Sequence, residues 1–126
     1  MNARLQTLAV IVATLSVSAS LSAHHSWPVS YSRMVTVKGT VTALSWENPH
    51  PMISLDVVGT DGKTEKWSVG GPAITRMEAS GWSRTTLKVG DVITGIGYQF
   101  SDGSKIIRLE KVVMADGKEL PVYSRR

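Results

Sequence analysis

The sequence of 126 residues contains no cysteine, and this absence excludes several kinds of chemistry. Without thiols there is no disulfide scaffold, no thiolate metal site and no cysteine nucleophile. The sequence also lacks a large excess of charge of one sign, because 14 Lys and Arg against 10 Asp and Glu give a net charge of only +4. The basic residues are scattered and lie mostly in predicted turns, unlike the basic patches of nucleic-acid-binding proteins. We therefore expect no nucleic-acid partner.

The motifs of the common enzyme classes are missing as well. The sequence has no paired-carboxylate motif, no phosphate-binding loop and no serine nucleophile elbow. Gly70-Gly71 precedes a predicted helix but lacks the Lys-Ser/Thr ending of a P-loop, so we interpret it as the start of that helix. We predict that the protein is not an enzyme.

Residues 1–23 have the pattern of a secretory signal peptide. Arg4 supplies a positive charge near the amino terminus, residues 8–15 (LAVIVATL) are apolar, and residues 16–23 are mostly small. The apolar run is shorter than the roughly 20 residues that span a bilayer, and no second run follows. An uncleaved anchor is the alternative. We expect export to the periplasm or beyond the bacterial cell, with no membrane span after cleavage.

The position of signal cleavage decides which residue becomes the new amino terminus. Cleavage after Ala19 follows a good small-x-small pattern. Cleavage after Ala23 makes His24 the first residue, and cleavage after Ser22 makes it the second. The sequence leaves these three sites open, and the domain is taken as residues 24–126.

The mature region predicts a small, mainly β domain. Alternating apolar residues indicate strands at about 35–46, 53–57, 65–69, 92–98 and 106–114. Proline and glycine delimit a helix of about two turns at residues 73–80, between the third and fourth strands. This order is that of the OB-fold, a five-stranded Greek-key barrel. We therefore predict an OB-like barrel, with an open sandwich over residues 64–126 as the alternative.

The three histidines, His24, His25 and His50, all lie outside the predicted strands. Imidazole is a common ligand of borderline metals, and no thiolate competes with it here. If cleavage leaves His24 first, its α-amine and imidazole form a chelate to which His50 adds a nitrogen. Cleavage after Ser22 instead places His25 third, where the amine, two amide nitrogens and an imidazole suit a square-planar ion. These nitrogen-rich sets favour Cu(II), ahead of Ni(II) and Zn(II).

A simpler interpretation of the histidines stands beside the metal site. His24 and His25 are then solvated, and His50, which lies between two prolines, bonds a backbone carbonyl and so holds its loop.

Tryptophan is abundant for a domain of this size. The four residues are Trp27, Trp46, Trp67 and Trp82. Trp46 and Trp67 fall on strand faces that we expect to be buried, whereas an exposed subset would form a stacking platform. We expect Trp46 and Asn48 to shape the loop around His50, with the Asn48 amide orienting the imidazole.

Several motifs of the chain are shared with one protein family. They are Ala23-His24-His25-Ser26, Gly39-Thr40-Val41-Thr42, Trp46-x-Asn48-Pro49-His50, Trp67-Ser68-Val69, Gly81-Trp82 and Leu87-Lys88-x-Gly90-Asp91. In these residues the chain resembles the small exported bacterial proteins catalogued as domain of unknown function 6152. The resemblance implies a periplasmic or secreted β-rich domain and supplies no reaction. It makes His24, His25 and His50 the candidate functional site.

Two functions follow from the sequence. The first is an exported binding protein that holds Cu(II) or another divalent metal through His24, His25 and His50. The second is an OB-like interaction module that binds an envelope protein, a glycan or a small molecule without metal. The two are distinguished by whether the chain can bring His24 or His25 next to His50.

Overall fold

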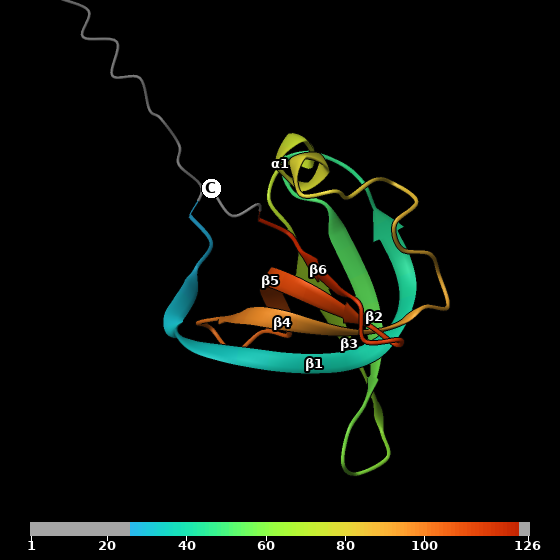
Figure 1. Ribbon diagram of the computed structural model, residues 1–126. Helices are drawn as coiled ribbons and strands as arrows, with labels where there is room; N and C mark the ends of the chain where they lie inside the picture. Colours follow the sequence, from blue (N-terminus) through green and yellow to red (C-terminus); the bar gives the residue numbers. More distant parts are fainter. Residues whose placement is uncertain (1–25, 124–126) are drawn as a thin grey trace, which may run out of the picture.

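Six strands and one helix make up residues 26–123, the part of the chain that the computed structural model describes (Figure 1). In chain order the elements are β1 (Val29–Ser45), β2 (Met52–Val58), β3 (Thr64–Gly70), α1 (Ile74–Ala79), β4 (Val92–Phe100), β5 (Ile106–Met114) and β6 (Glu119–Pro121). The prediction of a mainly β chain with one short helix between the third and fourth strands is therefore confirmed.

Two differences from the predicted strands have physical reasons. β1 begins at Val29, several residues before the predicted start, and Val29 pairs with Phe100 of β4 across a register shift. Residues 30–34 are all exposed, so they carry no apolar alternation from which a strand is predicted. β6 was not predicted because three residues are too few to show a period.

The first five strands are joined by their pairings into one closed circuit. The sheet order is β3-β2-β1-β4-β5-β6, and β3 also pairs with β5. These neighbours run antiparallel except β3 and β5, whose parallel pairing joins residues 68–70 to residues 106–108. Each of the first five strands thus has two partners within this set.

The core fills the space between the strands and extends under α1. Leu55, Val69, Ile107, Leu109 and Val112 are completely buried. In Figure 1, α1 lies over one end of the strands, opposite the turn between β2 and β3. Its Met77 is 1% exposed and joins this core, which explains why so short a helix is stable there.

Trp46 and Trp67, which were predicted to be buried, are less buried than Trp82. Trp46 and Trp67 are half-buried and pack against the core from its margin. Trp82, just after α1, is buried, and its indole N–H donates to the carbonyl of Pro121 at 2.9 Å. This bond ties the segment after α1 to β6.

The loop between β1 and β2 is attached to the beginning of α1. The side-chain oxygen of Asn48 accepts a hydrogen bond from the N–H of Ile74 at 3.1 Å. The N–H of Gly71 donates to the carbonyl of Pro51 at 3.0 Å. The loop that carries His50 is therefore held against the segment that leads into α1.

The helix of the described residues, 26–123, is too short and too polar to cross a membrane.

Candidate functional site

His50 is held in one orientation by a backbone carbonyl. Its Nδ1 lies 3.1 Å from the carbonyl oxygen of Gly71. A carbonyl oxygen only accepts hydrogen bonds, so Nδ1 carries the proton in this contact. The neutral ring then has its lone pair on Nε2, the nitrogen that is available to a ligand. His50 therefore bonds a backbone carbonyl, as the simpler interpretation of the histidines expects. This bond leaves Nε2 without a proton and open to a metal.

Trp27 packs against the imidazole of His50 from just before β1. The centres of these two rings are 4.4 Å apart. The rings of Trp27 and Phe100 pack edge to face, with their centres 5.7 Å apart. The carbonyl of the next residue, Pro28, accepts a hydrogen bond from the N–H of Ser101 at 2.8 Å. The start of the described chain is thereby fixed beside His50. No individual role for Trp27 is predicted from the sequence, because its neighbours carry no periodic pattern.

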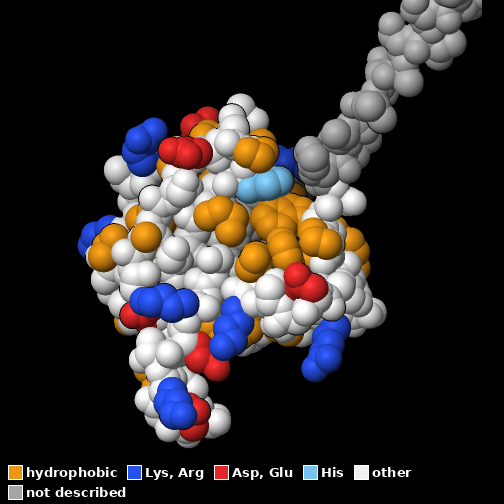
Figure 2. Space-filling model, turned by 180° about the vertical axis from the view of Figure 1, so that it is seen from behind, with side chains coloured by type: hydrophobic (Ala, Val, Ile, Leu, Met, Phe, Trp, Pro, Cys, Tyr) orange, Lys and Arg blue, Asp and Glu red, His pale blue; other side chains and the backbone are white. Residues whose placement is uncertain are grey.

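An open hollow of about 300 Å³ lies at these two rings. Its lining comes from the first described residues, β1, the β1–β2 loop, the start of α1, β5 and the last described residue. It includes Ser26, Trp27, His50, Pro72, Arg108 and Tyr123. Figure 2 shows the pale blue side chain of His50 at the surface, beside a group of hydrophobic side chains. The two ends of the described chain therefore meet at the hollow.

Two arginines and two tyrosines also line the hollow. The guanidinium carbon of Arg108 is 4.6 Å from the ring centre of Tyr123 and 5.4 Å from that of Tyr31. The guanidinium carbon of Arg76 is 5.6 Å from the ring centre of Tyr123. Arg108 also forms an ion pair with Glu110, its neighbour two residues along β5. Burial raises the pKa of the Tyr123 phenol above its usual value of 10.0, although the charge of Arg108 opposes this.

The tail that carries Tyr123 is anchored through the residue before it. Val122 is completely buried, and its N–H donates to the carbonyl of Glu110 at 3.0 Å. Its carbonyl accepts a hydrogen bond from the Ser80 hydroxyl at 3.3 Å. These contacts hold the Tyr123 ring at the two guanidiniums.

The predicted ligands are only partly within the described structure. His50 lies in the hollow, whereas His24 and His25 lie outside the described residues. Ser26, the residue next to His25, lines the same hollow. Within residues 26–123 no three His, Asp or Glu side chains are grouped as a metal site would require. A metal site at His50 therefore depends on ligands supplied from before Ser26.

The two residues expected to shape the loop act differently from the prediction. Asn48 bonds the N–H of Ile74, while the carbonyl of Gly71 orients the imidazole. Asn48 therefore supports the loop by linking it to α1. Trp46 lines a different cavity, together with Met77, Trp82 and Arg84.

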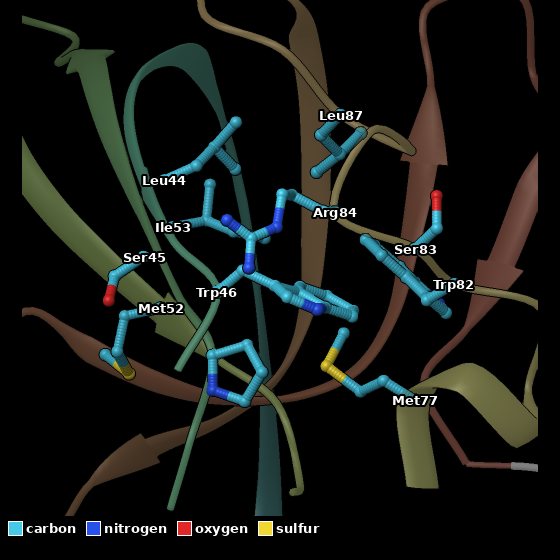
Figure 3. Close-up of a pocket in the computed structure, with 11 residues that line it drawn as sticks. Leu44, Ser45, Trp46, Met52, Ile53, Met77, Trp82, Ser83, Arg84 and Leu87 are labelled. Carbon is cyan, nitrogen blue, oxygen red and sulfur yellow. The ribbon is translucent and has the colours of Figure 1, made fainter. Parts of the chain in front are cut away.

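This second cavity is apolar and too small for a ligand. Figure 3 shows the indole of Trp46 between the side chains of Arg84, Met77 and Trp82. The space among them is about 20 Å³, the room of roughly one water molecule. Trp46 thus belongs to the packing around α1 and not to the site at His50.

Comparison with known proteins gives a family and a fold. Residues 11–107 match a family described as a family of unknown function, DUF6152. A solved structure, the ZRD-deleted mutant of TiaS in complex with agmatine, superimposes with a TM-score of 0.51 at 20% sequence identity. The match covers 75% of this chain and 28% of that one, so this chain spans less than a third of its length. Such a likeness concerns the fold alone. No curated protein matches the chain.

Proposed function

The chain belongs to the DUF6152 family, whose function is unknown, and we propose that it is an exported binding protein for Cu(II) or another divalent metal. The ligands are His50 together with His24 and His25 at the start of the mature chain. In this proposal the protein is not an enzyme, and residues 1–23 are a signal peptide that directs it to the periplasm or out of the cell. The observation that carries the proposal is the position of Ser26 in the same hollow as His50.

We further propose that the domain is an OB-like barrel. The support is the circuit of pairings through β1, β2, β3, β5 and β4, with α1 between β3 and β4 in the chain and over one end of the strands. In such a barrel the loops at one end gather on a common surface. The loop of His50 and the segment before β1 would then be on that surface.

The distance along the chain supports a shared site. Trp27 is in ring contact with His50, and His24 lies three residues before Trp27. Three extended residues span up to about 10 Å, which exceeds the separation of two ligands of one ion. With metal–nitrogen bonds of about 2.0 to 2.1 Å, two ligand nitrogens need to approach to about 3 to 4 Å. His24 and His25 are both within this reach.

The chemistry of His50 suits a metal ligand. Its Nδ1–H bond to the Gly71 carbonyl fixes the ring and increases the basicity of Nε2, as hydrogen-bonded histidines do in metal sites. If cleavage follows Ala23, His24 contributes an amine and an imidazole, and His50 contributes a third nitrogen. Cu(II) accepts such a planar set of nitrogens more strongly than the other common divalent ions.

One observation favours the second function, an interaction module without metal. Tyr31 and Met34, in the first half of β1, are 56% and 51% exposed, although both are large and hydrophobic. An envelope protein, a glycan or a small molecule would contact this half of β1. Binding of such a partner with no measurable metal affinity is the outcome that would favour the module.

Metal titration of the exported protein tests the proposal. Mass spectrometry first establishes the mature terminus, and calorimetry then compares Cu(II) binding to the natural protein and to His50→Ala. Loss of one imidazole ligand is expected to weaken binding about tenfold or more, about 1.4 kcal/mol. Met34→Ala is the matched control, because it removes an exposed donor of another kind outside the hollow. Equal affinity of the natural protein and His50→Ala would exclude His50, and the absence of binding below micromolar concentrations would overturn the proposal.

A further inference from the structure

The lining of the hollow beside His50 includes two arginines that the metal proposal does not use. Arg76 comes from α1 and Arg108 from β5, and both guanidiniums lie within 5.6 Å of the ring centre of Tyr123. Two like charges are thus held on one aromatic ring by separate elements of the fold. Positive charge gathered in this way attracts an anion.

Only one of the two positive charges of the lining is balanced by a carboxylate of the described residues. Among the described residues that line it, two are arginines and none is acidic. Glu110 pairs with Arg108, whereas no salt bridge within residues 26–123 involves Arg76. The Arg108 side chain is only 15% exposed, so its planar group is held with little freedom. Arg76 is exposed and has donors to give to a ligand.

The rest of the lining is mostly ring surface. Trp27, Tyr31 and Tyr123 provide aromatic rings, and Pro49 and Pro72 provide apolar ones. Binding sites for small molecules combine such apolar walls with a few placed polar groups that fix orientation. A volume of about 300 Å³ limits the occupant to a small molecule.

We propose that the two arginines at Tyr123 bind the carboxylate of a small organic acid that has an aromatic or apolar body. Guanidinium groups match a planar carboxylate with two parallel hydrogen bonds, and this geometry favours carboxylate over a spherical anion. The body of the acid packs on the tyrosine and proline rings. The phenol of Tyr123 is protonated at neutral pH, as an ordinary phenol is, and has an O–H to donate. The site uses neither His24 nor His25, so it goes beyond the metal proposal and does not depend on it.

Titration with benzoate in the presence of a chelator tests this site on the mature protein. Benzoate is compared with benzamide, which has the same ring without the charge, and with acetate and inorganic phosphate, which lack the ring. Binding is followed by the amide NMR shifts of residues around Tyr123 at constant ionic strength. We expect saturable benzoate binding at that position, with benzamide, acetate and phosphate each weaker by about tenfold or more, since a charged hydrogen bond and an apolar body each contribute about that factor.

Two arginine variants separate a built site from general surface charge. Arg76→Gln is expected to weaken benzoate binding about tenfold. Arg84→Gln removes the same charge at the other, apolar cavity and is expected to leave binding unchanged. Both side chains are exposed, so both variants should fold, and circular dichroism checks this. Equal binding of benzoate and benzamide, or equal affinities of the two variants, would overturn the proposal.

A further variant keeps this proposal distinct from the metal site. The double variant His24→Ala/His25→Ala removes two of the three proposed metal ligands but no residue of the proposed carboxylate site. We expect it to lose Cu(II) and to keep benzoate with unchanged affinity. Loss of benzoate binding in this variant would contradict a separate carboxylate site, whereas unchanged Cu(II) binding would contradict the metal site alone.

Discussion

The imidazole of His50 lies against the indole of Trp27, with ring centres 4.4 Å apart and ring planes inclined by 47°. His50 comes from the loop after β1, and Trp27 comes from the residues before it, so β1 joins the two partners of this contact. The contact brings the beginning of the described chain to the only histidine within it. The metal proposal rests on this contact, because the proposed ligands His24 and His25 precede Trp27 by only three and two residues.

Copper binding at His50 should quench the fluorescence of Trp27 because a paramagnetic Cu(II) ion quenches a nearby indole. We expect Trp27→Phe to lose most of the Cu(II)-dependent quenching. Trp67→Phe, which changes a tryptophan outside the hollow, is the matched control and should keep the quenching of the natural protein. Quenching of the same size in both variants would show that the ion binds away from His50.

Removal of the Asn48 side chain should destabilise the fold through α1. Asn48→Ala leaves the N–H of Ile74 without its partner, and loss of such a helix-start acceptor costs about 1 kcal/mol in the free energy of unfolding. Asn48→Asp keeps an acceptor oxygen and should keep most of the stability. Urea unfolding of the two variants measures the difference. If Asn48→Asp and Asn48→Ala lose the same stability, the hydrogen bond to Ile74 contributes nothing.

Replacement of the buried indole after α1 should cost more than replacement of a half-buried one. Trp82→Phe removes the hydrogen bond to the Pro121 carbonyl and shrinks a side chain that is 5% exposed, at a combined cost of about 1 to 3 kcal/mol. The indole N–H of Trp67 bonds the exposed end of Glu65 at 3.3 Å, and water can replace that bond. Trp67→Phe should therefore cost less than Trp82→Phe in the same denaturant experiment, and the reverse order would contradict the tie between α1 and β6.

The stability of the protein should fall at alkaline pH because of Tyr123. Its pKa is raised by burial in the folded state, so between about pH 10 and the folded pKa the unfolded chain has lost a proton that the folded chain retains. The contribution of this group is present below the unfolded pKa and decreases as the pH rises toward the folded one. Denaturation series from about pH 8 to about pH 11 should show a steeper fall for the natural protein than for Tyr123→Phe. Parallel curves would contradict the raised pKa.

The sequence predicts the regular part of the fold well. The strand from Ile106 to Met114 has the predicted bounds, and α1 lies within the predicted residues 73–80. The strand has alternating apolar residues that pack on the core, and the helix is delimited by proline before it and glycine after it. The beginning of β1 has no such period because its residues are exposed on both faces. Pairing with β4 determines its strand structure, and this long-range contact leaves no local pattern.

The candidate site was predictable only where one residue type carries the chemistry. His50 stood out because histidine is rare in this chain, and the structure places it in a hollow. The roles of Trp27, Arg76, Arg108 and Tyr123 were not predicted. These residues come from separate segments, and only the folded sheet brings them together. The prediction that Asn48 supports the loop of His50 was right, but its predicted partner was wrong. Its side-chain oxygen bonds the N–H of Ile74 in α1 and not the imidazole.

The most direct test of the metal proposal is electron paramagnetic resonance of the Cu(II) complex of the exported protein. With histidine labelled by ¹⁵N, the proposal predicts coupling of the copper electron to imidazole nitrogens, and the loss of one of them in His50→Ala. An unchanged spectrum in His50→Ala, or a spectrum without imidazole coupling, would contradict it.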